Sequence, residues 1–268
     1  MGIIQIIIIF IFNFTLILNQ NIDDSCSDSE QSPVNIITSE IREISVPPLK
    51  IIRSYYPSFG NIKLDLNDMS LKPDKWENAK LYIDYYNKTV IYIPDKIYVR
   101  IFSEHSFENL KYDIELQICH NYANIENQND IDVPEKLCIS IFFDSGRNKK
   151  SKIFDQFYKE REYEVNLTNK YILKNIENID LNLYINFNEP YYFYMGSGTS
   201  VDNKEFDCSL QVYWILMKKV NYMSEEELRN LRLAIIQKNK KKTIKKSKKV
   251  KNEGNLIYYF ENKKEKSD

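Results

Sequence analysis

Short runs of alternating apolar and polar residues recur along most of the chain. Side chains of a strand point alternately to its two faces, so this period of two is typical of strands with one buried face. The runs are rich in β-branched and aromatic residues, and Pro, Gly, Asn or Asp separate them. They cover residues 61–67, 80–86, 89–93, 96–102, 112–120, 136–144, 180–187 and 209–217. So many strands in one domain predict a mainly β fold built on a large, mostly antiparallel sheet.

One helix is predicted after the last of these runs. The segment SEEELRNLRLAI begins with Ser224 and has Glu227 three residues further on. Ser and Glu at this spacing form a capping box, in which each side chain accepts a hydrogen bond from the other residue's backbone N–H. The helix is therefore expected to begin next to Ser224.

The N-terminal residues are apolar and are followed at once by the polar stretch NIDDSCSDSE. A membrane-spanning helix needs about 20 apolar residues, and Gln5 and Asn13 interrupt this run. The pattern favours a secretory signal peptide over residues 1–22, and hence a secreted or cell-surface protein. An uncleaved anchor is the alternative, because no positive n-region and no clear small-x-small cleavage site are visible.

The C-terminal end has a different composition from the rest of the chain. Nine lysines lie between Lys238 and Lys251, and without them the formal net charge would fall from −1 to −10. This composition predicts a domain over residues 23–236 and a lysine-rich, largely disordered tail over residues 237–268. A solvated tail is favoured, and electrostatic contact with an anionic surface is the alternative. Nucleic-acid binding is not expected, because neither a folded motif nor interleaved aromatic residues accompany the lysines.

Export would add glycans and disulfides to the chain. The triplets NKT and NLT make Asn87 and Asn166 candidate N-glycosylation sites in polar surroundings. The cysteines are Cys26, Cys119, Cys138 and Cys208. Cys119 and Cys138 fall in two of the predicted strands and could be neighbours, but buried thiols are the more common outcome and are expected here.

Five motifs, in this order, resemble those of the α-carbonic anhydrases. They are QSPVNI (31–36), SEH (103–105), YDIELQICH (112–120), YYFYMGS (191–197) and CSLQVYW (208–214). The resemblance implies a single domain around a large, mostly antiparallel twisted sheet with a few peripheral helices. It also implies a disulfide between Cys26 and Cys208, because secreted members of the family join cysteines at these places.

The resemblance implies a zinc ion held by three imidazoles, with water in the fourth position. This chain contains two histidines in all. Arg100 and Phe102 stand at the expected His-x-His positions, and Gln117 stands at the third. Glutamine is a poor zinc ligand, and an arginine would repel the ion. Zinc is therefore expected to be absent, and carbon dioxide hydration is not expected.

Residues around the lost zinc site are retained. The resemblance places Glu104 as the partner of a hydroxyl at Thr199 or Ser200. It places His105, Glu115 and Tyr194 in a buried polar network, and His120 in a structural role. These residues are interpreted as scaffold.

The leading hypothesis is an exported, catalytically inactive protein of this type that serves as a binding or structural module. Its ligand would be an unknown protein partner or a small anion in the former funnel. The alternative is a zinc-dependent carbonic anhydrase with an atypical ligand set, for example His105 or His120 with Glu104, Glu115 or Cys119. Strand alternation argues against a shared site, because it points Glu115 and Cys119 to one face and His120 to the other.

Overall fold

The computed structural model is described here for the residues whose placement is defined. These are residues 32–44, 49–53, 62–65, 70–73, 80–85, 88–123, 133–146, 151, 164–165, 171–172, 182, 184–198, 211–236 and 257–261. The predicted signal peptide, Cys26, Asn87, Asn166, Thr199, Ser200, Cys208 and the lysines of 238–251 lie outside them. Within the described residues no helix is long and apolar enough to cross a membrane.

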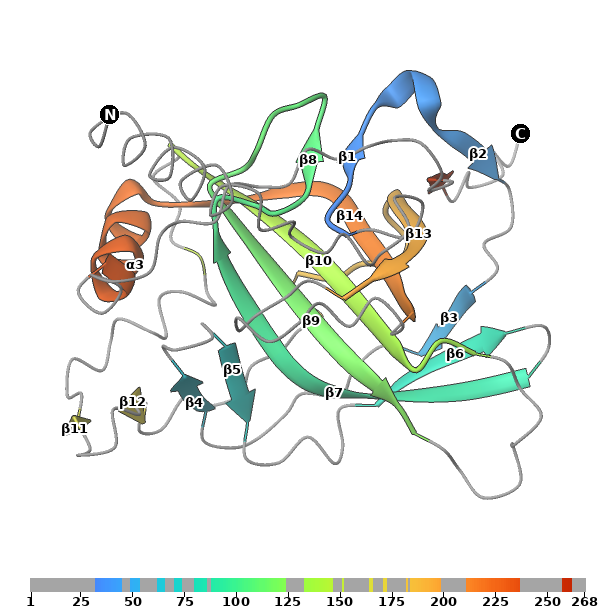
Figure 1. The fold of residues 1–268 in the computed structure, drawn as a ribbon, viewed down its shortest axis with the longest axis horizontal. Helices are drawn as coiled ribbons and strands as arrows, with labels where there is room; N and C mark the ends of the chain where they lie inside the picture. Colours follow the sequence, from blue (N-terminus) through green and yellow to red (C-terminus); the bar gives the residue numbers. More distant parts are fainter. Residues whose placement is uncertain are drawn as a thin grey trace, which may run out of the picture.

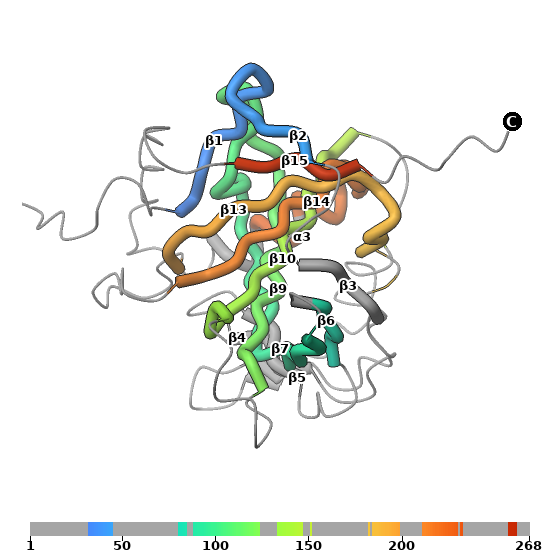
Figure 2. Tube along the Cα trace, turned by 90° about the vertical axis from the view of Figure 1, so that its right-hand side faces the viewer, coloured from blue at the N-terminus to red at the C-terminus, as the bar shows by residue number. Residues whose placement is uncertain are grey.

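A twisted sheet of 13 strands dominates the described part of the chain (Figures 1 and 2). Its main path runs β11 (Glu164–Val165), β12 (Tyr171–Ile172), β4 (Ile62–Asp65), β5 (Ser70–Pro73), β7 (Lys88–Ile101), β9 (Ile114–Tyr122), β10 (Lys136–Ser145), β14 (Gln211–Met223), β13 (Tyr191–Ser197), β15 (Tyr258–Phe260) and β2 (Arg42–Ile44). Off this path, β3 (Leu49–Arg53) pairs with β6 (Leu81–Tyr85), which pairs with β7. Only the β10–β14 and β15–β2 pairs of this sheet are parallel among the described strands. The predicted mainly β fold with a mostly antiparallel sheet is confirmed.

Strands β10, β13 and β14 contribute side chains to two apolar clusters, one on each face of the sheet. Ile114, Leu116 and Ile118 of β9 belong to one cluster, which also includes Leu228 and Leu231 of helix α3 (Glu225–Ile236). The other cluster consists of Val34, Ile36, Cys138, Phe142, Tyr192, Tyr194, Val212, Trp214, Leu216 and Ile257. We call these the helix-side and site-side clusters. Because alternate residues of a strand face opposite sides, Glu115, Gln117 and Cys119 point toward the site-side cluster.

The capping box predicted for α3 is confirmed. The Glu227 backbone N–H donates to Ser224 Oγ at 3.2 Å, and the Ser224 N–H donates to Glu227 Oε2 at 2.8 Å. The Glu227 carboxylate also accepts the Ser151 N–H, at 3.0 Å to Oε1. The helix N-terminus is therefore fixed both to its own first turn and to a distant part of the chain.

Two of the predicted strands differ from the observed ones. The predicted strands 89–93 and 96–102 are one strand, β7, which ends at Ile101, because a bulge between Pro94 and Lys96 accommodates the proline without ending the strand. A strand is expected over 180–187, but the described residues of this range, 182 and 184–187, lie in no strand, so the prediction is wrong for them. There Asn186 accepts the N–H of Asn188 through its side chain (3.1 Å) and that of Glu189 through its carbonyl (2.9 Å), so local hydrogen bonds replace strand pairing.

Five residues of the predicted C-terminal tail, 257–261, belong to the described structure. Residues 258–260 form β15, which lies between β13 and β2 (Figure 2). Tyr258 and Tyr259 lie opposite Phe193 and Tyr192, with ring centroids 5.2 Å apart in both pairs. Lys218 Nζ donates to Tyr259 Oη at 3.1 Å. In sequence, the lysines of 238–251 stand between α3 and β15, and they lie outside the described residues.

Cys119 and Cys138 form a disulfide, so the expectation of two buried thiols is wrong. The two residues lie directly opposite each other on antiparallel strands β9 and β10, with 4.1 Å between their Cα atoms. Side chains of directly opposite residues share one face of the sheet, which brings the sulfur atoms together. Disulfides are typical of extracytoplasmic proteins.

Ending the chain after Leu256 should destabilise the domain because it removes β15 and uncovers the aromatic residues of β13. We expect the melting temperature to fall on the order of 10 °C in differential scanning calorimetry. A chain that ends after Glu261 keeps β15 and is the matched control. Equal melting temperatures for the two truncated chains would contradict the role assigned to β15.

Candidate functional site

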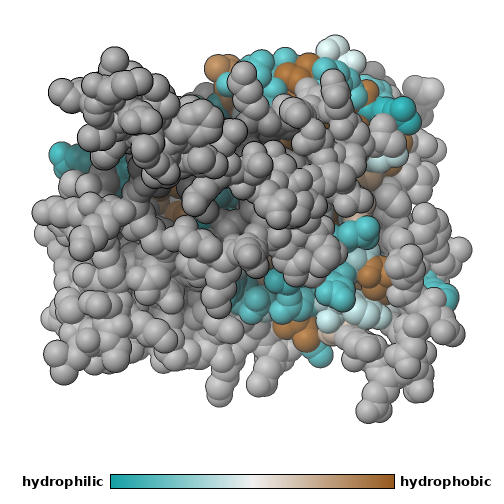
Figure 3. All heavy atoms as spheres, in the orientation of Figure 1, coloured by the Kyte–Doolittle hydropathy of each residue, from teal (hydrophilic) through white to brown (hydrophobic). Residues whose placement is uncertain are grey.

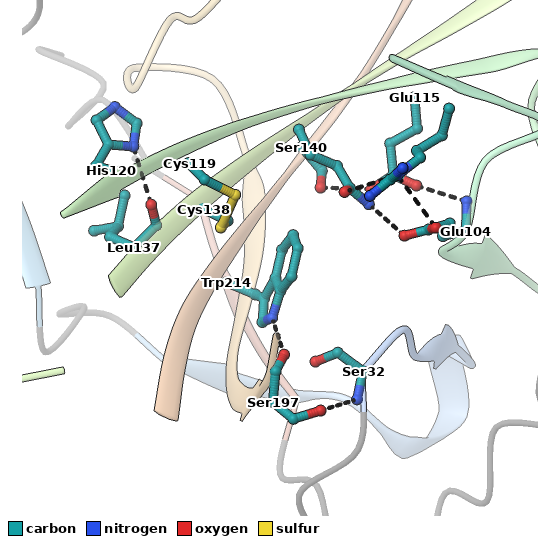
Figure 4. Close-up of a disulfide and its surroundings, with 12 residues drawn as sticks. Ser32, Glu104, Glu115, Cys119, His120, Leu137, Cys138, Ser140, Ser197 and Trp214 are labelled. Carbon is teal, nitrogen blue, oxygen red and sulfur yellow. Dashed lines mark hydrogen bonds and ion pairs between the residues drawn. A yellow bond between two sulfur atoms is a disulfide. The ribbon is translucent and has the colours of Figure 1, made fainter. Parts of the chain in front are cut away.

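Glu115, a fully buried carboxylate on β9, lies at the centre of the candidate site (Figure 4). It accepts hydrogen bonds from the backbone N–H groups of Glu104 (2.8 Å) and His105 (3.1 Å) and from Ser140 Oγ (2.6 Å). Burial alone would raise the pKa of Glu115, but the electrostatic interaction and hydrogen bonds with His105 and the Ser140 hydroxyl outweigh it and lower the pKa to about 2. Glu115 is therefore ionised at neutral pH.

A chain of polar contacts leads from Glu115 to the N-terminal segment. His105 Nδ1 lies 2.6 Å from Glu115 Oε1, and His105 Nε2 lies 2.7 Å from Tyr194 Oη. Tyr194 donates to Ser32 Oγ at 3.0 Å, and the Ser32 N–H donates to Ser197 Oγ at 3.1 Å. Burial raises the pKa of Tyr194 well above its usual range, so this hydroxyl remains a donor. The chain connects the sheet to the segment that begins at Ser32.

Arg100 and Gln117 extend the hydrogen-bond network from Glu115 to the side chain of Glu104. Arg100 Nε lies 3.2 Å from Glu104 Oε1 and donates to Gln117 Oε1 at 3.3 Å. Gln117 Nε2 donates to Glu104 Oε2 at 2.9 Å and to Glu115 Oε1 at 3.1 Å. We call Arg100, Glu104, Glu115 and Gln117 the carboxylate cluster.

The strand register clarifies which residues share this face. Tyr98 lies directly opposite Gln117, and Arg100 lies directly opposite Glu115. Phe102 follows the end of β7, has a φ of 58° and is 52% exposed. The two positions of a His-x-His pair on this face would therefore be Tyr98 and Arg100. From the sequence alone the pair is expected at Arg100 and Phe102, and the assignment of Phe102 stays a prediction.

His120 lies on the helix-side face, away from the carboxylate cluster. Its Nδ1 is 3.0 Å from the carbonyl oxygen of Leu137, and the ring is fully buried. Burial lowers the pKa of His120 to about 4, against two backbone hydrogen bonds that raise it. Cys119 faces the cluster but is joined to Cys138. His120, Cys119 and Glu115 therefore do not converge on one site.

The residues at this place do not fit a three-imidazole zinc site. Tyr98, Arg100 and Gln117 provide no imidazole, and the Gln117 carbonyl faces a guanidinium. Both nitrogens of the nearby His105 ring contact Glu115 and Tyr194. Among the described residues no group of three His, Cys, Asp or Glu side chains is arranged to hold a metal ion.

The family model described as eukaryotic-type carbonic anhydrase matches residues 19–255. The chain belongs to this carbonic anhydrase family. Solved structures agree in fold. A halotolerant carbonic anhydrase from Dunaliella salina has a TM-score of 0.66 at 16% identity, covering 88% of this chain and 89% of that chain. The α-carbonic anhydrase of Thermovibrio ammonificans with sulfanilamide has a TM-score of 0.59 at 19% identity, covering 86% and 87%.

Dioscorin complexed with ascorbate has a TM-score of 0.58 at 20% identity, covering 87% of this chain and 86% of that chain. A search of curated protein sequences finds no match. Because these identities are low, the solved structures establish the carbonic anhydrase fold of this chain and leave its activity to be argued from the site.

The structure brings together most of the residues selected from the carbonic anhydrase motifs. Glu104, His105, Glu115 and Tyr194 form one connected group, while Thr199 lies outside the described residues. Ser140, Ser32 and Tyr98 were missed. Ser140 and Tyr98 each lie directly opposite Gln117, on the two neighbouring strands. Only the strand register could have identified them as residues of the site.

Gly196 allows β13 to approach Ser32 closely. A Cβ atom at this position would collide with Ser32 Oγ and would lie 2.6 Å from Tyr194 Cε2. We expect Gly196→Ala to lower the free energy of unfolding by about 1–3 kcal/mol in urea titrations. Gly198→Ala is the matched control, because its Cβ would meet only Val212 Cγ2, at 4.0 Å. Equal stability of the two variants would refute the close approach.

His120 should make stability depend on pH. The pKa of His120 is lowered in the folded state, so its contribution to stability is complete above the ordinary histidine pKa of 6.5 and is lost as pH falls toward about 4. The wild type should lose about 2 kcal/mol between pH 7 and pH 5 from this residue.

The variant His120→Asn can still donate to the Leu137 carbonyl but does not titrate. Urea unfolding at both pH values should show a clearly smaller loss for this variant. An unchanged pH dependence would mean that another group titrates in this range.

Proposed function

We propose that this carbonic anhydrase family member is an exported, catalytically inactive protein that acts as a binding or structural module. The contact of Arg100 with Glu104 and Gln117 carries this proposal. Zinc catalysis needs a dication with an open position for water. Here a guanidinium on the same sheet face already contacts Glu104 and Gln117, at 3.2 and 3.3 Å. A second cation would be repelled by it.

Three further observations support export and binding. The Cys119–Cys138 disulfide is typical of an oxidising compartment, and the apolar residues 1–22 fit a signal peptide. Dioscorin, which shares this fold, has been solved with ascorbate. This supports a small organic anion as one ligand class, and a protein partner is the other.

The surface offers single apolar side chains to a partner. The exposed large hydrophobic residues among those described are Phe102 (52%), Leu110 (73%) and Met195 (39%). On the face in Figure 3, hydrophobic and hydrophilic described residues alternate over short distances. Such a mixed surface supports a polar interface with a few apolar anchors.

Elemental analysis combined with a carbon dioxide hydration assay tests the proposal. Purified mature protein should contain no stoichiometric zinc and should show no hydration rate above that of the buffer, because no imidazole trio is available. The Dunaliella salina carbonic anhydrase, prepared in the same way, is the positive control. One zinc per chain with measurable hydration would contradict the proposal and would establish the alternative, an enzyme with an atypical ligand set.

A further inference from the structure

The carboxylate cluster contains two negative charges that lie close together. Gln117 Nε2 donates to both, at 2.9 Å to Glu104 and 3.1 Å to Glu115. Glu115 has His105 as a further partner, 2.6 Å away. Glu104, whose side chain is 27% exposed, has Arg100. Among the described residues the guanidinium is therefore the cation within ion-pair distance of Glu104, while Lys111 interacts electrostatically with both carboxylates without forming an ion pair.

The orientation of Gln117 also depends on Arg100. Its carbonyl oxygen accepts from Arg100 Nε, and its amide nitrogen faces the two carboxylates. Only this orientation gives every polar atom of the amide a partner of the right kind. Without the guanidinium the carbonyl would lose this hydrogen bond within a largely buried group.

We propose that the Arg100 guanidinium takes the electrostatic place of a bound metal cation in this fold, neutralising Glu104 and fixing the Gln117 amide. The inference rests on the proposed function, since it describes a protein that works without zinc. It deepens that proposal by naming what replaces the ion. The arginine is a positioning residue whose charge, more than its volume, is required.

Packing is the competing explanation. The guanidinium carbon lies 4.9 Å from the centre of the Tyr98 ring, and the Arg100 side chain is only 13% exposed. Loss of this contact would also destabilise the fold. Charge and packing are separable because neutralising Glu104 removes the need for the charge and does not restore the packing.

A double-mutant cycle on dialysed, zinc-free protein makes this separation. Arg100→Met keeps an unbranched side chain but removes the charge, and it should lower the melting temperature by roughly 5–10 °C. Glu104→Gln keeps an oxygen acceptor for Gln117. Adding it to Arg100→Met should restore about half of the loss or more. If Arg100→Met does not fold, the rescue is measured as recovery of folded, soluble protein in the double variant.

The surface pair Lys219–Glu189 is the matched control. Its atoms lie 2.7 Å apart, but the side chains are 60% and 27% exposed. Lys219→Met should change the melting temperature by no more than about 2 °C, and Glu189→Gln should not alter that result.

Failure of Glu104→Gln to rescue Arg100→Met would overturn the inference and would assign the role of Arg100 to packing on Tyr98. That outcome would leave the proposed function standing. Uptake of one zinc by the dialysed wild type, measured separately, would instead contradict the proposed function. The two failures are therefore distinguishable.

Discussion

The burial of the Glu115 carboxylate is the constraint on which the site depends. An ionised carboxylate removed from water must have its oxygens satisfied by donors, or the fold loses several kcal/mol. The donors come from the backbone of the loop after β7, from Ser140 on β10 and from His105. Satisfying one side chain thus fixes the course of that loop, the register of two strands and, through Tyr194, the segment at Ser32.

The same constraint divides the sheet into two environments. On β9 the residues that alternate with Glu115 and Gln117 are apolar and pack against the helix-side cluster. His120 belongs to this second environment, where burial lowers its pKa and favours the neutral ring. The two histidines therefore have different roles: His105, in the loop after β7, contacts Glu115 on the site-side face, whereas strand alternation points His120 of β9 to the helix-side face.

The sequence allowed the fold and the central network to be predicted, because both depend on local patterns and on motifs with fixed order. The capping box at Ser224 is of this kind, since its two residues are three apart in sequence. Contacts between distant residues were not predictable in this way. β15 pairs with strands far away in the chain, and its aromatic residues have no period that separates them from the neighbouring lysines. The pairing of Cys119 with Cys138 and the position of Tyr98 opposite Gln117 depend on register, which one residue of slip would change.

Under the proposed function, the polar centre must keep its charges balanced without a metal ion. A bound ligand stabilises a protein only in proportion to the logarithm of its free concentration relative to its dissociation constant. A metal-dependent cluster therefore weakens when the ion is scarce. A guanidinium attached to β7 is present at all times, and it contacts Glu104 and Gln117 without any supply from outside. In the proposed arrangement the carboxylates still require a positive charge nearby, although no reaction is catalysed. Arg100 supplies that charge and stands in the place of the metal ion that would have activated water.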